Sequence, residues 1–171
     1  MTRALDYLFA LLGLVFLSPI ILIVLVLGYF DTGSPVFVQK RVGKNKKPFK
    51  LVKFRTMAVG TQSVASHLAS TSSITPLGRF LRKTKIDELP QLINVVKGEM
   101  SLVGPRPNLF NQDELIAARD AKGIYDVLPG ITGLAQVNHI DMSTPELLAQ
   151  TDRKMIDSLS LKHYFLYIIK T

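Results

Sequence analysis

The chain has 171 residues, with 21 Lys and Arg against 13 Asp and Glu, a formal net charge of +8, and no Cys. The lack of Cys excludes disulfide-stapled domains, thiolate metal sites and cysteine nucleophiles, and a mean hydropathy of +0.25 in so charged a chain excludes a disordered or an ordinary soluble protein. The charge is uneven, because residues 32–86 hold 12 basic residues and no acidic one. We therefore expect an anionic partner at this stretch.

The first element is an apolar segment of 24 uncharged residues, from Tyr7 to Phe30. Seventeen of them are Leu, Ile, Val or Phe, which favours insertion into a membrane by about 5–10 kcal/mol. The segment is too long for the apolar core of a signal peptide, and residues 31–35 do not form a small-x-small cleavage site. The pattern predicts a segment that lies in a membrane.

Ser18 and Pro19 divide this segment into two halves of 11 residues. Each half is about 16 Å long as a helix, roughly half of a bilayer. A kink is expected there, because proline removes one backbone hydrogen bond and a nearby Ser can satisfy a freed carbonyl. A kinked spanning helix and a helix that enters and leaves on one face both fit the pattern, and the flanking charges do not decide between them.

The next part of the chain predicts short elements. Residues 35–56 predict a β-hairpin that turns at 43–47, and residues 58–75, rich in Ser, Thr and Ala, predict a mobile loop. Helices are expected at 77–83 and at 87–97, the second of them ending at Gly98.

A short apolar run at 100–103 leads into a rigid Gly-Pro-Arg-Pro turn, and a helix capped by Asn111 is expected at 111–122. Residues 134–138 read as extended, and Thr144-Pro145 opens a last helix, before an aromatic and apolar stretch at 159–169. No repeat and no second soluble domain are indicated. The fold class is therefore expected to be α+β, mostly helical with little strand.

Asp87 and Glu88 are the first acidic residues after 55 residues that contain none. At a helix N-terminus, the dipole and the capping amides would keep Asp87 ionised, and neighbouring cations lower a carboxylate pKa further. An ionised, positioned Asp is a candidate nucleophile, and the adjacent Glu is a candidate ligand for a divalent cation or a proton shuttle. The structural alternative is that Asp87 only caps a helix and Glu88 is a first-turn acid.

Basic residues around this pair are candidates for phosphate binding. Arg106, in the Gly-Pro-Arg-Pro turn, is a candidate clamp because a guanidinium binds phosphate oxygens bidentately. Lys53 and Arg55 are two residues apart, so they would share a strand face and reach one phosphate, unless that face is solvated or meets lipid headgroups. Three more candidates, for substrate or for anionic headgroups, are Arg79, Arg82 and Lys83.

Three blocks of the sequence resemble the bacterial sugar transferases, the monotopic phosphoglycosyl transferase family. They are KFRTM at 53–57, GRFLRKTKIDELPQLINVVKGEMSLVGPRP at 78–107 and PGITGLAQVN at 129–138. An apolar segment broken by Ser-Pro precedes them and a closing segment at 152–161 follows them, in the order of the family. The resemblance covers essentially the whole chain.

The resemblance implies an enzyme that moves a sugar 1-phosphate from a UDP-sugar to polyprenol phosphate, usually undecaprenol phosphate, and releases UMP, the first membrane step of glycoconjugate or polysaccharide assembly. Asp87 resembles the nucleophile, which forms an aspartyl phosphosugar, and Glu88 resembles the residue associated with Mg²⁺.

The resemblance also implies a re-entrant helix–break–helix at Ser18-Pro19. The expected domains are then a membrane-embedded part, 1–31, and a compact catalytic domain, 32–171, with a short β-hairpin and membrane-interface helices. This domain would lie on the cytoplasmic face of the bacterial inner membrane.

The expected partners are a UDP-sugar, polyprenol phosphate and membrane lipid, with no nucleic acid, and a homo-oligomer is compatible with the sequence. Departures from the family pattern, such as Thr71, Ser73 and the His139-Ile140-Asp141 run, lie away from the acidic pair and bear on the choice of sugar. The competing interpretation is a membrane-anchored basic adaptor that binds anionic lipid without catalysis. It accounts for the anchor and the charge, but not for an Asp-Glu pair in this extended pattern.

Overall fold

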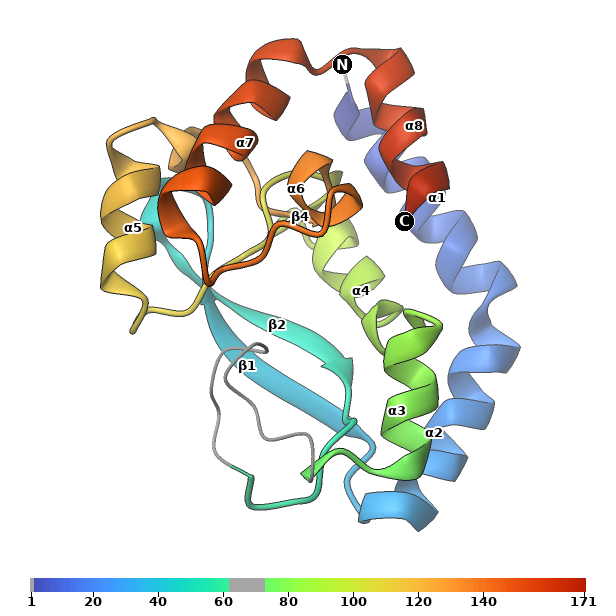
Figure 1. Cartoon of the computed structure of the whole chain (residues 1–171). Helices are drawn as coiled ribbons and strands as arrows, with labels where there is room; N and C mark the ends of the chain where they lie inside the picture. Colours follow the sequence, from blue (N-terminus) through green and yellow to red (C-terminus); the bar gives the residue numbers. More distant parts are fainter. Residues whose placement is uncertain (1, 62–72) are drawn as a thin grey trace.

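The computed structural model describes residues 2–61 and 73–171 of the chain (Figure 1). It combines helices with two small two-stranded sheets, which confirms the predicted mixture of helix and strand. Most of the loop predicted at 58–75 lies outside the described residues.

Helices α1 (Thr2–Phe16) and α2 (Ser18–Thr32) form an N-terminal pair that is bent by 61°. Pro19, in the first turn of α2, has no amide to donate to the Val15 carbonyl oxygen of α1, and that oxygen instead accepts from the Ser18 hydroxyl at 2.8 Å. The predicted kink is thus confirmed. Within the described ranges no helix is by itself long and apolar enough to cross a membrane, whereas the bent pair taken together has the length and composition of a broken span or a re-entrant loop.

The inner face of α1 belongs to the core of the molecule. Ala10 is completely buried in one cluster with Leu92 and Val95. Asp6 is also completely buried, and its carboxylate accepts hydrogen bonds from the Ser101 hydroxyl, the Leu102 amide and the Tyr164 hydroxyl at 2.8, 3.0 and 2.9 Å. The outward faces of α1 and α2 are apolar and exposed, as at Leu11, Phe16, Ile23, Val26 and Phe30.

The predicted β-hairpin is confirmed. Strands β1 (Val36–Val42) and β2 (Pro48–Phe54) pair antiparallel, with Val36 opposite Phe54 and Val42 opposite Pro48, and the short helix η1 (Lys44–Lys46) makes the turn. Helix α3 (Pro76–Lys83) follows, and the Thr75 hydroxyl caps it by accepting from the Gly78 amide at 2.9 Å.

The single helix predicted at 87–97 is wrong. The chain forms a 3₁₀ turn, η4 (Ile86–Glu88), and then helix α4 (Gln91–Val96). Pro90 has no amide to donate to the Ile86 carbonyl, and the Leu89 amide donates to that carbonyl instead, at 3.1 Å, so the two pieces do not merge. Asp87 therefore lies inside the 3₁₀ turn and does not cap α4. The predicted stop at Gly98 agrees with its left-handed backbone, φ 80°.

Strands β3 (Ser101–Val103) and β4 (Gly130–Thr132) pair in parallel, with Ser101 opposite Gly130. A Cβ atom on Gly130 would lie 2.0 Å from the Gly104 nitrogen, so only glycine permits this approach of the two backbones.

The remaining elements are helical. Helix α5 (Asp113–Asp120) is shorter than predicted and begins after Gln112, not at Asn111, and η5 (Ile124–Asp126) follows it. The extended stretch expected at 134–138 is wrong: residues Leu134–Val137 form one helical turn, α6, which buries Ala135 against Leu115 and Leu148. The chain closes with α7 (Pro145–Ser158) and α8 (Leu161–Lys170), which lies beside α1 (Figure 1) with the rings of Phe165 and Phe9 6.0 Å apart.

Candidate active site

Asp87 and Glu88 are a buried pair of adjacent carboxylates. Both lie in η4, and their exposed fractions are 7% and 8%. Lys85, the residue just before η4, has a left-handed backbone, φ 59°, which turns the chain sharply from α3 into η4. Buried carboxylates need cationic or hydrogen-bonding partners, and the surrounding elements supply them.

Three of the predicted phosphate-binding residues lie around this pair. The Arg106 guanidinium donates from Nη2 to Oε1 of Glu88 at 2.6 Å, a charge-assisted hydrogen bond. Lys53, half-buried on β2, and Arg82, on α3, both act electrostatically on Asp87. Arg82 is held by a hydrogen bond from its Nε to the Thr56 hydroxyl at 2.9 Å. The fold thus gathers cations from β2, α3 and the Gly-Pro-Arg-Pro turn onto the acidic pair.

The expectation that Asp87 has a lowered pKa is wrong. Burial, with the added repulsion of Glu88, raises the pKa of Asp87 to about 6, and the nearby cations Lys53, Arg106 and Arg82 offset only part of this. Burial lowers the pKa of the Lys53 ammonium to about 8, helped by Arg41 and opposed by the charge of Asp87. Both groups therefore titrate within two pH units of neutrality, as groups in active sites often do.

Arg41 also belongs to this site, although the sequence analysis did not single it out. It is buried on β1, where Nη1 donates to the Pro107 carbonyl oxygen at 3.1 Å and Nη2 donates to Oε1 of Gln39 at 2.6 Å. Burial, with Arg106 close by, lowers the pKa of its guanidinium to about 10. The sequence shows only that Gln39 and Arg41 lie two apart on a predicted hairpin strand and so share a face; that this face is buried is seen only in the fold.

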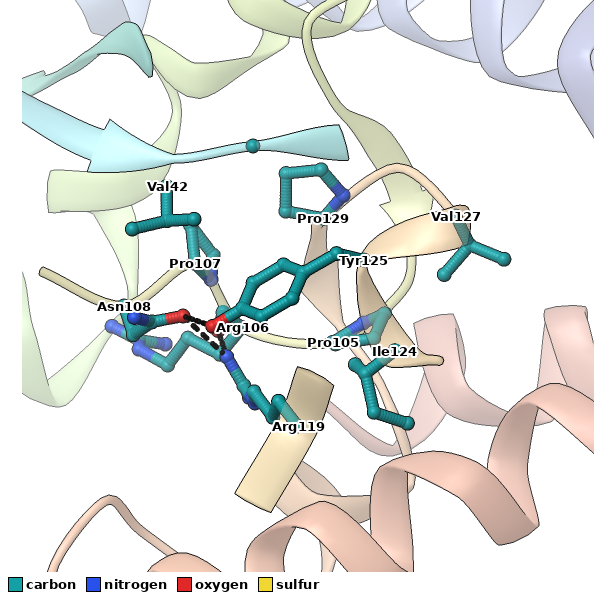
Figure 2. A pocket seen from close by; sticks show the side chains of 11 residues that line it. Val42, Pro105, Arg106, Pro107, Asn108, Arg119, Ile124, Tyr125, Val127 and Pro129 are labelled. Atoms are coloured by element: carbon teal, nitrogen blue, oxygen red, sulfur yellow. Dashed lines mark hydrogen bonds between the residues drawn. The ribbon is translucent and has the colours of Figure 1, made fainter. Parts of the chain in front are cut away.

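A second buried network supports the Gly-Pro-Arg-Pro turn from below (Figure 2). Arg119, on α5, donates from Nη1 to the Arg106 carbonyl oxygen at 2.8 Å and to Oδ1 of Asn108 at 3.0 Å. The Tyr125 hydroxyl donates to the same Asn108 oxygen at 3.1 Å, as Figure 2 shows. Arg119 in turn pairs with Asp152 of α7. The sequence analysis missed this network, because its members are far apart along the chain.

The other three predicted substrate-binding residues are placed differently. Arg55 donates from Nε to the Ser34 carbonyl oxygen at 2.8 Å, and its guanidinium lies over the Phe37 ring. Arg79 and Lys83 are exposed on α3. These positions suit a protein surface better than contact with the acidic pair.

Two pockets lie near the pair: Arg106, the partner of Glu88, lines one, and Glu88 itself lines the other. The first, of about 390 Å³, is lined by Arg41, Arg106, Gln136 and His139 together with apolar side chains, and is named the polar pocket after its charged residues. The other, of about 310 Å³, is mostly apolar and includes Glu88 in its wall. Lys85 lines both pockets.

The acidic pair is also the place to consider a metal ion. Among the described residues, no group of three or more His, Cys, Asp and Glu side chains is arranged to hold one. Mg²⁺, however, is commonly bound by only one or two carboxylates together with substrate phosphates. Asp87 and Glu88 fit such an ion, shared between protein and substrate.

Comparison with known proteins gives consistent matches. The model of the family described as bacterial sugar transferase matches residues 1–171. The chain is 42% identical to the uncharacterized sugar transferase EpsL of Bacillus subtilis, over 91% of this chain and 79% of that protein. It is 38% identical to the UDP-glucose:undecaprenyl-phosphate glucose-1-phosphate transferase of Caulobacter vibrioides, over 91% of this chain and 61% of the relative. It is 37% identical to an uncharacterized sugar transferase of Haemophilus influenzae, of which it spans 37% of the length.

Proposed function

This chain belongs to the bacterial sugar transferase family, and from that membership we propose that it transfers a sugar 1-phosphate from a UDP-sugar to a polyprenol phosphate and releases UMP. The observation that carries the proposal is the buried Asp87–Glu88 pair with Lys53, Arg82 and Arg106 around it. A site that binds a diphosphate and stabilises a transferring phosphoryl group needs such a concentration of cations.

In the proposed first step, a carboxylate oxygen of Asp87 attacks the phosphorus that carries the sugar. The bond from that phosphorus to the bridging oxygen breaks, and UMP leaves with the electron pair. The product is an aspartyl phosphosugar. Asp87 must be ionised to attack, and its raised pKa, about 6, leaves it mostly ionised at neutral pH and more basic than an ordinary carboxylate.

In the proposed second step, a phosphate oxygen of the polyprenol phosphate attacks the same phosphorus. The bond to Asp87 breaks, the carboxylate is regenerated, and a polyprenyl diphosphosugar forms. Lys53, Arg82 and Arg106 face the negative charge in both steps, and Arg41 adds positive charge next to Arg106. Because donor and acceptor react in turn, the kinetics should be of the ping-pong type.

Mg²⁺ is part of the proposal. Glu88, with Asp87 beside it, would hold the ion together with phosphate oxygens of the donor. When bound, the ion supplies further neutralisation of the phosphate charge. The protein's own residues do the rest: Arg106 fixes the Glu88 carboxylate through its 2.6 Å hydrogen bond.

We further propose that the bent pair α1–α2 is a re-entrant membrane element, which would place the rest of the chain on the cytoplasmic face of the bacterial inner membrane. The support is the 61° bend after Phe16 and the exposed apolar side chains along both helices. An exposed apolar surface of this extent is unfavourable in water and favourable in lipid.

The test is release of UMP from a panel of UDP-sugars in the presence of undecaprenyl phosphate and Mg²⁺. We expect release with at least one donor from the wild type and none from Asp87→Asn. The competing proposal, a basic adaptor that binds anionic lipid, predicts vesicle binding without UMP release from any donor. The buried acidic pair speaks against the adaptor, because lipid binding needs exposed cations and no buried carboxylates.

A further inference from the structure

The pocket beside Glu88, here the apolar pocket, is lined mostly by apolar side chains, which the binding of a sugar nucleotide does not require. Its wall comes from η4, α4, β3, β4 and α8, and its apolar side chains are Ile86, Leu89, Leu92, Leu102, Ile131 and Ile168. Its volume, about 310 Å³, is that of a small-ligand site. A lining of this kind binds hydrocarbon.

Charged groups stand at one side of this hydrocarbon-lined space. Glu88, which is paired with Arg106, lies in the wall, and so does Lys85. Lys85 also lines the polar pocket, so the two pockets adjoin at this side chain. A ligand with an apolar chain and a phosphate at its end matches this arrangement: the chain in the pocket, the phosphate at Lys85 and next to the acidic pair.

The backbone of Lys85 supports a functional reason for its position. Its φ of 59° is unfavourable for a residue with a side chain, and such strain is often kept at functional sites. Among the described residues, four other than glycine have positive φ. Two of them, Asn45 and Lys46, make the hairpin turn, and the other two, Lys85 and His139, line the polar pocket.

An exposed apolar surface lies beside the pocket, on the helix that supplies part of its wall. Ile168 is on α8, and on the same helix Phe165, Leu166 and Ile169 are exposed. Helix α8 packs beside α1, whose outward face is apolar as well (Figure 1). A long hydrocarbon chain that extends beyond the pocket can therefore lie against apolar side chains of α8 and α1.

We propose that this pocket binds the isoprenoid units nearest the phosphate of the lipid acceptor, and that Lys85 binds that phosphate. The inference rests on the proposed function, because it assigns a separate binding site to the polyprenol phosphate that accepts the sugar phosphate in that reaction. The donor then uses the polar pocket, and the two substrates reach Asp87 from different sides.

The experiment separates the acceptor from the donor. Exchange of labelled UMP into the UDP-sugar reports the first half-reaction, which needs no acceptor. Ile168→Trp fills the pocket, so we expect the KM for undecaprenyl phosphate to rise about tenfold or more while the exchange rate stays within twofold of wild type. Leu147→Trp is the matched control: it introduces the same side chain at an exposed apolar position of α7 that lines neither pocket, and should leave both values unchanged.

Lys85 is tested in the same assay. Lys85→Met keeps the aliphatic stem and removes the charge, so the acceptor KM should rise, and Lys85→Arg should restore it. An unchanged acceptor KM in folded Ile168→Trp, or an equal loss of exchange, would overturn the assignment. If the pocket instead holds a phospholipid chain, Ile168→Trp should lower the rate at every concentration of undecaprenyl phosphate and leave the KM for this acceptor unchanged. That result would also overturn the assignment.

A second measurement does not depend on turnover. A prenyl phosphate with a photoreactive group on its first isoprenoid unit should label peptides that contain Leu102 or Ile168, and Ile168→Trp should suppress that labelling. Labelling confined to residues 2–32 would contradict the pocket. Failure of UMP exchange in the wild type would instead refute the proposed function itself.

Discussion

Arg119 and Asp152 form a fully buried ion pair that joins α5 to α7. Nε and Nη2 of Arg119 both donate to Oδ2 of Asp152, at 3.0 and 2.7 Å, and the side chains are 2% and 0% exposed. Because the same guanidinium also donates to the Arg106 carbonyl oxygen, the pair holds the turn that presents Arg106 to Glu88. A contact more than 30 residues away from either acidic residue in sequence therefore positions the candidate active site.

The first prediction concerns this pair. Asp152→Asn leaves the charge of Arg119 buried without its counter-ion, so unfolding should become easier by about 3–5 kcal/mol and turnover should fall as Arg106 shifts. Thermal unfolding and UMP release in detergent measure the two effects. Asp157→Asn is the control, since Asp157 lies on the same helix in an exposed pair with Arg153, whose loss should leave the stability nearly unchanged. Equal stability of the two variants would contradict the positioning role.

The second prediction concerns the nucleophile. Asp87→Asn keeps the shape of the side chain but cannot attack phosphorus, so turnover should fall by several orders of magnitude and no phosphosugar should be trapped on a peptide that contains residue 87. Turnover near that of wild type in the purified variant would end the covalent proposal.

The same substitution should not weaken the fold at neutral pH. The folded-state pKa of Asp87, about 6, lies above its usual value of 3.8, so its contribution to stability is fully present below about pH 4 and is lost as pH rises through 6. This rise in the pKa of Asp87 corresponds to roughly 3 kcal/mol, an upper bound on the gain expected for Asp87→Asn at pH 8. Unfolding at pH 4 and pH 8 should therefore show the variant's advantage only at the higher pH.

The third prediction concerns the pH profile. The plot of kcat/KM should rise as Asp87 ionises near pH 6 and fall as Lys53 loses its proton near pH 8. Lys53→Arg keeps the charge to higher pH and should remove or displace the alkaline limb. The control is Lys50→Arg, an exposed position on the same strand, which should leave the profile as it is. An alkaline limb that persists unchanged in Lys53→Arg would show that another group causes it.

The fourth prediction concerns the metal ion. EDTA should abolish UMP release, excess Mg²⁺ should restore it, and Glu88→Gln should raise the Mg²⁺ concentration needed for half-maximal activity. Glu114→Gln, at an exposed position on α5, should leave that concentration unchanged. Full wild-type activity in EDTA would refute the role of the ion.

The fifth prediction concerns topology. The chain has no Cys, so single Cys residues at positions 2 and 44 can be probed with a membrane-impermeant thiol reagent in intact cells. Protection of both positions before lysis is expected for a re-entrant pair, and labelling of position 2 alone would mean that the helix crosses the membrane. Pro19→Ala restores a backbone amide in α2 and should move position 2 toward the labelled side if the proline determines the bend.

Local signals explain what the sequence could predict. The kink at Ser18-Pro19 and the hairpin turn at 43–47 each depend on residues within one turn of one another, and both are present. The prediction of a single helix at 87–97 is wrong because Pro90 has no amide to donate to the Ile86 carbonyl, and the four residues of α6 are too few to show a helical period.

The site itself was predictable only in its residue types. Motifs indicated Asp87, Glu88 and Arg106, but their contact geometry depends on packing between distant elements. The pKa of Asp87 went against expectation because burial, which a sequence does not display, outweighs the neighbouring cations. Arg41 and the Arg119–Asp152 pair were missed for the same reason, since only the fold shows that they are buried.

The hydrogen bonds that Asp6 accepts from Ser101, Leu102 and Tyr164 bear on how the protein is made and handled. Helix α1 is synthesised before two of its partners, Ser101 and Tyr164, so the Asp6 carboxylate cannot be buried with these hydrogen-bond donors until the chain has been made as far as Tyr164. For the same reason, deletion of residues 2–32 would not yield a water-soluble catalytic fragment. It would remove one wall of the core over Leu92 and Val95 and leave two buried hydroxyls without their acceptor. Detergent or nanodisc preparations of the whole chain are therefore the material in which its chemistry can be measured.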